Sequence, residues 1–342
     1  MHITNNLTKP QKAAVSHIRS DLRLVYTVLM NHEFIKSNFQ LMLFPLTATI
    51  IDGTEDWIKS YNNSHSPKIE MPLFKPEEER FYEAARNAIK LWDMDYYQLR
   101  DLLAEKYSES DEYFSGLYKP LAKHLRLYDI YGADVANGKY CGNTILCNSY
   151  IPQWKFGEED GERLKNMAII GGRYIRLFDA MDQYHVDTTL RFSYVDYGGF
   201  IKSPVGNQFS DKFVLFSLLC QINFVLICVG RYILEECPSK LRFAYLLYYY
   251  LCKLLPEINC ESRTAFTVNQ EFVSDLFRNA MAHYKIGVAL KQDEIVDNDI
   301  FFGLTQKYFG CDYLVLKDHV FQELSLLEKQ ISTYLQLKDV VQ

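Results

Sequence analysis

The chain has 342 residues and a net charge of −6, so it is long enough to bury a large core and to form two domains. It is rich in Tyr (25) and Phe (22) and poor in Gly (16) and Pro (10), which favours a mainly helical protein. The negative charge argues against broad, nonspecific binding of nucleic acid, although it leaves room for a small basic site.

The cysteines and the N-terminus both indicate a reducing compartment. The eight cysteines include no CxxC pair, and no Cys/His cluster has the spacing of zinc ligands. We therefore expect buried free thiols, with neither a metal nor a cofactor. The first residues are polar and lack the apolar segment of a signal peptide, which predicts a cytoplasmic protein.

The first part of the chain is predicted to be mostly helical. Residues 8–51 fit one or two helices, interrupted at Pro45. Another helix is predicted to begin near Pro76, because the glutamates that follow it favour a helix N-terminus. Further helix is predicted over 99–104 and 118–127.

Glycines then punctuate residues 130–162, which makes this irregular segment the best candidate for a boundary or an elaborated loop. A helix is predicted from about 162 to 183. Residues 188–195 alternate and are rich in β-branched and aromatic side chains, so they predict a short strand. We assign residues 1–206 to a mostly helical N-terminal region and 207–342 to a second domain.

Three apolar helices are predicted in residues 207–342. The helix over 210–236 is apolar enough to approach the lower limit for a membrane span, but two amides favour a central bundle helix, buried or touching a second subunit, over a membrane segment. The tyrosines of 241–255 fit core packing better than base stacking. The helix over 318–340 carries an apolar seam whose partner lies in the same bundle or in another protomer.

One stretch combines residues suited to phosphodiester chemistry. As a helix, residues 273–284 place an apolar face that includes Leu276 opposite a side that carries Arg278, Asn279 and Ala282, with His283 at the edge. Asn279 and His283 are four apart and therefore neighbours, whereas Arg278 lies about 140° from His283 around the helix. A guanidinium grips phosphate oxygens and an imidazole moves protons near neutral pH. The Asn279 amide is expected to orient the imidazole ring.

This stretch also resembles a known family. Its six residues are Arg278, Asn279, Ala280, Met281, Ala282 and His283, and they resemble the RNxxxH signature of the HEPN superfamily. Those domains are all-helical, and many are metal-independent ribonucleases of toxin and defence systems. The resemblance covers the motif and its surroundings, residues 207–342, and implies a HEPN-like helical bundle. It also implies that Arg278 and His283 are the catalytic pair and that Asn279 supports them.

One departure limits what the resemblance implies. Some branches of the family have a Tyr two places after the His, whereas here position 285 is Lys and the tyrosine is the adjacent Tyr284. The chemistry associated with that branch is therefore not assigned.

The resulting expectation is a metal-independent RNA endonuclease that cleaves by attack of the ribose 2′-hydroxyl, acting as a toxin or anti-phage defence effector. Because one imidazole must both remove and deliver a proton, the resemblance implies a homodimer with a composite site acting on RNA. Residues 1–206 are then a sensor, inhibitor or substrate selector, and an inhibitor or trigger protein is a further partner. Two alternatives stay open: a noncatalytic HEPN-like module that binds nucleotide, RNA or protein, and a structural or regulatory protein with a vestigial motif.

Overall fold

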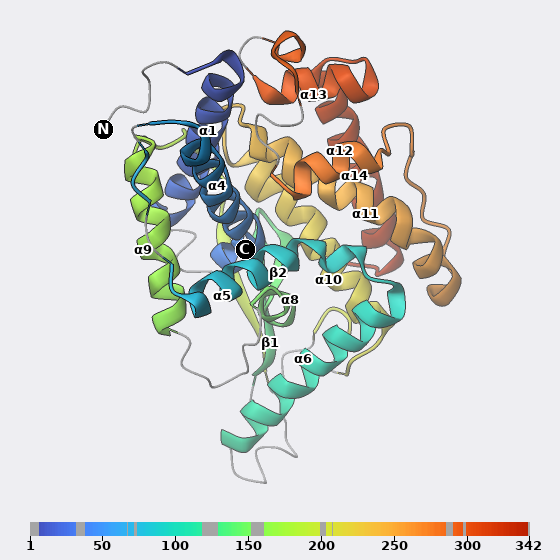
Figure 1. Cartoon of the computed structure of the whole chain (residues 1–342). Coiled ribbons are helices and arrows are strands. Elements are labelled where there is room, and N and C mark those ends of the chain that lie inside the picture. Colours follow the sequence, from blue (N-terminus) through green and yellow to red (C-terminus); the bar gives the residue numbers. More distant parts are fainter. Residues whose placement is uncertain are drawn as a thin grey trace.

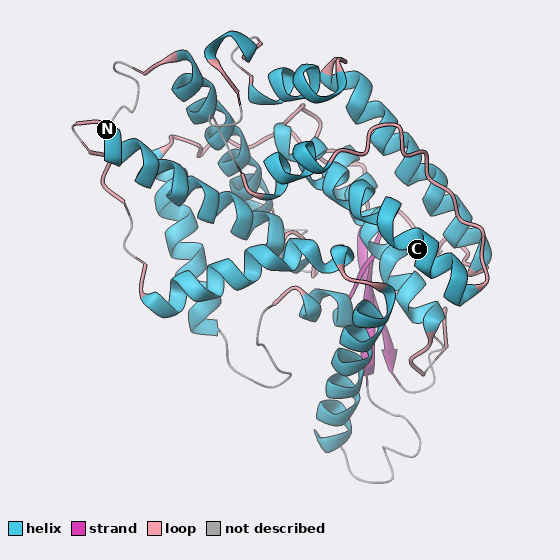
Figure 2. Ribbon diagram, turned by 45° about the vertical axis from the view of Figure 1, so that its right-hand side comes forward, coloured by secondary structure: helices cyan, strands magenta, loops and turns pink. Residues whose placement is uncertain are grey.

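Helices make up most of the molecule, and a small antiparallel sheet lies among them (Figure 1). The computed structural model describes residues 7–31, 38–66, 68–71, 74–117, 129–151, 161–198, 203–206, 208–284, 290–296 and 299–340. Figure 2 shows how the few strands lie against the surrounding helices. The prediction of a mainly α protein with a short strand region is confirmed.

Three helices of the N-terminal region begin close to the predicted positions 8, 76 and 162, whereas the one predicted over 99–104 already begins at Tyr96 and a short helix at Thr144–Ser149 was not predicted. The helices of this region are α1 (Lys9–Met30), α3 (Phe39–Met42), α4 (Phe44–Ser64), α5 (Pro76–Asn87), the 3₁₀-helix η1 (Ala88–Asp93), α6 (Tyr96–Leu117), α8 (Thr144–Ser149) and α9 (Gly161–Leu177). Helix α1 starts at a capping box, in which the Thr8 hydroxyl accepts from the Gln11 amide at 3.4 Å and the Gln11 side chain accepts from the Thr8 amide at 2.9 Å. The helix predicted over 118–127 lies outside the described residues.

The sheet corrects the interpretation of 130–162 as a boundary or loop. Strands β1 (Asp129–Ala136) and β2 (Lys139–Asn143) form a hairpin, and β3 (Phe192–Gly198) adds to the other side of β1, giving the antiparallel order β2-β1-β3. Asn137 and Gly138 have φ of 53° and 83°, as a tight two-residue turn requires. Helix α8 follows β2 directly, while 152–160 lie outside the described residues.

Two of the glycines that suggested a loop lie inside strands instead. A Cβ on Gly132 of β1 would be 2.0 Å from the Tyr194 hydroxyl, and a Cβ on Gly142 of β2 would be 3.0 Å from the Asp134 carboxylate. These glycines let neighbouring side chains approach the backbone closely. Glycine within a strand often marks such a close approach, and not only a loop. Strand β3 lies at 192–198, slightly later than the predicted 188–195.

The C-terminal part of the chain is helical. Its elements are α10 (Asp211–Asn223), the π-helix η2 (Phe224–Arg231), α11 (Pro238–Ser262), α12 (Asp275–Ala282), the 3₁₀-helix η3 (Gln292–Glu294), α13 (Ile300–Phe309) and α14 (Tyr313–Tyr334). The side chains from Phe213 to Asn223 of α10 are all buried, between β2 and α14. Among the described residues, Asp211–Arg231 is the one helix long and apolar enough to cross a bilayer, and 83% of its apolar window is buried, as expected of a central bundle helix.

The seam of the last helix has its partner inside the same chain. Val320, Leu324, Leu327 and Ile331 of α14 are fully buried, and α14 packs on α10 and α11. Phe213–Asn223 of α10 and this seam are therefore covered within the chain, whereas Leu234, near the end of the predicted 210–236 helix, is 60% exposed.

A single hydrophobic core runs through both halves of the chain. It extends from α1 and α4 to α11 and α14, and polar contacts also cross position 206, such as Asn143 donating to the Ser217 hydroxyl at 3.1 Å. The core shows no break at this position among the described residues. The division into 1–206 and 207–342 stays a prediction.

Candidate active site

The first five RNxxxH residues, 278–282, form the C-terminal part of α12, an eight-residue helix that is shorter than the predicted 273–284, and His283 is its C-cap. The Ser274 hydroxyl caps its N-terminus by accepting from the Phe277 amide at 3.2 Å. The helix ends at His283, whose amide donates to the Asn279 carbonyl at 3.0 Å. The next residue, Tyr284, has φ of 47° and turns the chain away from the helix axis.

The buried face of α12 differs from the expected one. Phe277 is fully buried, with its ring centroid 4.6 Å from that of Tyr245 and 4.9 Å from that of Phe309. Ala282, expected on the polar side, is buried too, whereas Leu276 is 65% exposed. Asn279 is half-buried and His283 is exposed. Because positions three, four and seven apart share a helix face, Leu276 lies on the same face as Asn279 and His283.

The guanidinium of Arg278 lies near two aromatic rings and has no ionic partner among the described residues. Its guanidinium carbon lies 5.1 Å from the centroid of the Tyr249 ring and 5.9 Å from that of Tyr250. Its Nε is buried without a hydrogen-bond partner, and among the described residues Arg278 forms no ion pair. The side chain as a whole is half-buried. A cation in this state keeps its charge for an incoming anion.

Asn279 does not play the part that the sequence suggested for it. No hydrogen bond joins its amide to the His283 imidazole, and within the described part of the chain the Asn279 side chain has no hydrogen-bond partner at all. The two residues are linked through the main chain only. The amide is therefore available to a ligand and does not fix the ring.

The tyrosines of α11 anchor the loop before α12, which confirms their packing role. The Tyr245 hydroxyl donates to the Phe272 carbonyl at 2.9 Å, and the Tyr248 hydroxyl donates to the Asn269 carbonyl at 2.7 Å. Tyr249 donates to the Asp275 carboxylate in the first turn of α12. This hydrogen bond, together with the nearby Lys253 ammonium, lowers the pKa of Asp275. All three rings are buried and present no stacking face to RNA.

Tyr284 connects the end of α12 to a buried polar cluster that the sequence did not reveal. Its hydroxyl donates to Asp21 Oδ2 at 2.7 Å, and its ring lies under the Arg242 guanidinium, 4.2 Å from centroid to Cζ. Arg242 donates to the same oxygen at 2.6 Å, and Ser239 donates to Asp21 Oδ1 at 2.6 Å. His17 completes the cluster, with Nε2 3.2 Å from Asp21 Oδ2. The signal in the sequence was that His17 and Asp21, two ionisable residues four apart, lie among the apolar residues of one face of α1.

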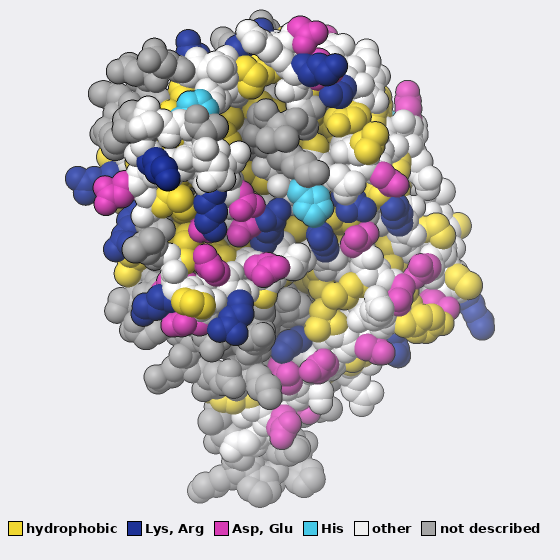
Figure 3. Space-filling view, viewed as in Figure 1, with side chains coloured by type: hydrophobic (Ala, Val, Ile, Leu, Met, Phe, Trp, Pro, Cys, Tyr) yellow, Lys and Arg dark blue, Asp and Glu magenta, His cyan; other side chains and the backbone are white. Residues whose placement is uncertain are grey.

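Charged side chains of one sign do not dominate the surface of the molecule that Figure 3 shows. Figure 3 shows basic and acidic side chains interspersed over the face in view, in keeping with the net charge of −6. Within the described ranges, no group of three or more His, Cys, Asp or Glu side chains is arranged to hold a metal ion. The eight cysteines are free, and six of them are buried.

Comparison of the chain with protein-family models, with curated proteins and with solved structures finds no match.

Proposed function

We propose that the chain is a metal-independent RNA endonuclease with Arg278, Asn279 and His283 as its active-site residues. The observation that supports this most directly is the state of the two ionisable groups on α12. Arg278 has no ionic partner among the described residues, and His283 is exposed at the end of the same short helix. A guanidinium and an imidazole that both reach solvent are the two groups that phosphodiester cleavage without a metal requires.

In the proposed reaction, His283 removes the proton from the ribose 2′-hydroxyl. The 2′-oxygen attacks the adjacent phosphorus, the bond to the 5′-oxygen breaks, and a proton is delivered to that leaving oxygen. The products are a 2′,3′-cyclic phosphate and a 5′-hydroxyl. Arg278 stabilises the negative charge that develops on the phosphoryl oxygens, and the unpartnered Asn279 amide contacts the phosphate or the ribose.

A second copy of the chain supplies the second proton carrier. One imidazole cannot act as base and acid in the same step, whereas two copies of His283 in one cleft divide these tasks. Leu276 supports this arrangement, because an exposed leucine on the face of His283 gives a second copy an apolar contact. Helix α10 and the α14 seam take no part in such a dimer, since both are buried within the chain.

The test is cleavage of a labelled RNA in the presence of EDTA, with identification of the product ends. We expect cyclic-phosphate ends, and we expect His283→Ala and Arg278→Ala each to slow cleavage by about 100- to 10,000-fold. His185→Ala and Arg176→Ala are the matched controls, because both side chains are exposed outside α12 and should be dispensable. Cleavage at the wild-type rate by a folded His283→Ala protein would exclude this site.

The same assay distinguishes the proposed nuclease from a noncatalytic binding module. A binding module retains RNA without forming product, and Arg278→Ala then weakens retention while His283→Ala leaves it unchanged. In a toxin or defence role in the cytoplasm, expression of the wild-type chain arrests growth and expression of His283→Ala does not. A protein that relieves this arrest would be the inhibitor, and one needed for it would be the trigger.

A further inference from the structure

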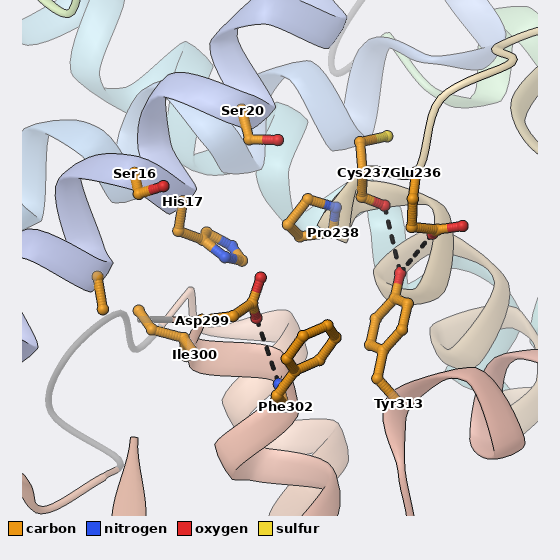
Figure 4. A pocket seen from close by; sticks show the side chains of 11 residues that line it. Ser16, His17, Ser20, Glu236, Cys237, Pro238, Asp299, Ile300, Phe302 and Tyr313 are labelled. Atoms are coloured by element: carbon orange, nitrogen blue, oxygen red, sulfur yellow. Dashed lines mark hydrogen bonds between the residues drawn. The ribbon is translucent and has the colours of Figure 1, made fainter. Parts of the chain in front are cut away.

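A cavity of about 230 Å³ lies between α1 and the N-terminal ends of α11 and α13. This volume equals roughly seven or eight water molecules at about 30 Å³ each, which is room for a small organic molecule. Ser16 and Glu236 are the exposed residues of its lining, so the cavity opens to solvent beside them. Figure 4 shows the side chains of α1 facing those of α13 and of residues 236–238 across it. The cavity is separate from Arg278 and His283, neither of which lines it.

One carboxylate of the lining has an oxygen that is open to a ligand. Asp299 Oδ1 caps α13 by accepting from the amides of Phe301 at 2.7 Å and Phe302 at 3.2 Å. Asp299 Oδ2 has no hydrogen-bond or ionic partner in the part of the chain that the structure describes, and it is not one of the unpartnered polar atoms sealed from solvent there. Figure 4 shows this oxygen directed toward the space between His17 and Pro238, away from the Phe302 amide. Asp299 therefore presents an accessible, unpaired acceptor to the cavity.

Two other carboxylates near the cavity already have counter-ions, whereas Asp299 has none among the described residues. Glu236 pairs with Lys317, and Asp21 pairs with Arg242 at 2.6 Å. The N-terminus of α13 contributes only about half a positive charge, so the carboxylate of Asp299 that caps it keeps a net negative charge. An unpaired negative charge in a partly enclosed site attracts a cation.

The remaining walls are mostly apolar and aromatic. They include Ala13, Pro238 and Ile300, together with the rings of Phe302 and Tyr313, whose centroids lie 5.4 Å apart. Aromatic faces attract a cation, and apolar walls favour a hydrocarbon body. Within the described ranges no group of side chains is arranged to hold a metal ion, so the cation that fits this cavity is organic.

We propose that this cavity binds a small primary amine in its ammonium form, with a short apolar body. The ammonium donates to Asp299 Oδ2, and the body packs against Pro238 and Phe302. A hydrogen bond between two charged groups is stronger than one between neutral groups, so the charge of the amine contributes most of its affinity. A ligand that carries a carboxylate or a phosphate in place of the amine is repelled by Asp299. This inference does not rest on the nuclease proposal.

The experiment is calorimetric titration of the full-length chain with benzylamine near neutral pH and at low ionic strength. We expect saturable binding of benzylamine and at least tenfold weaker binding of benzyl alcohol, which has nearly the same shape but no charge. Benzoate is expected not to bind, because it brings a second carboxylate to Asp299. The amide of Nα-acetyl-lysine is the arm that distinguishes a free amine from a lysine side chain of a partner protein. We expect it to bind more weakly than benzylamine, because its two amide groups lose water against apolar walls.

Three variants locate the binding. Ser16→Trp places a ring at the opening of the cavity, and Ser108→Trp places the same ring on an exposed position of α6. We expect the first to abolish benzylamine binding and the second to preserve it. Asp299→Asn removes the charge but keeps an oxygen that caps α13, so it should weaken binding at least tenfold at an unchanged melting temperature.

Four results would each overturn the proposal. They are failure of benzylamine to bind, equal binding of benzyl alcohol, tighter binding of the lysine derivative than of benzylamine, and wild-type binding by either Ser16→Trp or Asp299→Asn.

Discussion

Replacing Asp21 by asparagine tests the buried cluster that holds the end of α12. The carboxylate is fully buried and accepts from Arg242, Ser239 and Tyr284 at 2.6 to 2.7 Å. Asp21→Asn changes one acceptor oxygen into a donor and leaves the Arg242 charge, on a side chain that is 2% exposed, without a counter-ion. Breaking a buried pair in this way costs about 3–5 kcal/mol, a large part of the 5–15 kcal/mol of a typical domain.

The assay is urea denaturation at pH 7, followed by circular dichroism, with stability taken from the midpoint and slope. Asp101→Asn is the matched control, because this carboxylate is 78% exposed and lies 4.0 Å from Arg100, so no measurable change is expected. The double variant Asp21→Asn, Arg242→Met should be less destabilised than Asp21→Asn alone, since it removes the orphaned charge. A loss below about 1 kcal/mol in Asp21→Asn would refute the reasoning.

The pH dependence of the same variant has a defined sign. Burial alone raises the pKa of Asp21, but the charge of Arg242 and the hydrogen bond from Ser239 help to outweigh it and hold this pKa well below its ordinary value. A lowered carboxyl pKa contributes stability that is complete above the unfolded value of about 3.9 and is lost as the pH falls below it. The difference between wild type and Asp21→Asn should therefore be constant near neutrality and shrink in acid.

Two further predictions concern stability. Gly53→Ala should destabilise the fold by about 1–3 kcal/mol, because the added Cβ would lie 2.2 Å from the Tyr284 ring. Gly172→Ala, which has open space in α9, should instead stabilise the fold by about 0.5–1 kcal/mol. Thermal denaturation distinguishes the two variants, and equal melting temperatures would contradict the close contact at Gly53. Burial raises the pKa of Asp134 to about 6, so the folded state binds its proton more tightly than the unfolded state, and stability falls as the pH rises from about 4 through 6. Relative to Asp134→Asn, the wild type should lose about 2–3 kcal/mol between pH 4 and pH 7, and parallel pH profiles in denaturant titrations would show that this carboxyl is not responsible.

Local periodicity in the sequence was enough to predict most of the longer helices and to place Arg278 and Asn279 on a helix. The unbroken apolar run of α10 and the alternating steps of the α14 seam each predicted a buried face, because a helix places residues three and four apart on one side. The same rule predicted that Arg278 and His283 belong to one short helix. It failed for Leu276 and Ala282, because the exact face that packs depends on where α11 and α13 lie.

Only the tertiary structure decided the contacts between distant segments. The hairpin at 129–143 was hidden because its glycines, which usually mark loops, are used for close approach of Tyr194 and Asp134 across the sheet. The cluster of Asp21, Arg242 and Tyr284 joins positions more than two hundred residues apart, and no local spacing encodes such a pairing. The sequence by itself determined which residues prefer helix and which faces are apolar, since these are properties of neighbouring side chains. The sheet, the buried charges and the cavity beside His17 follow from how those faces pack, which is decided by shape and charge complementarity across the whole chain.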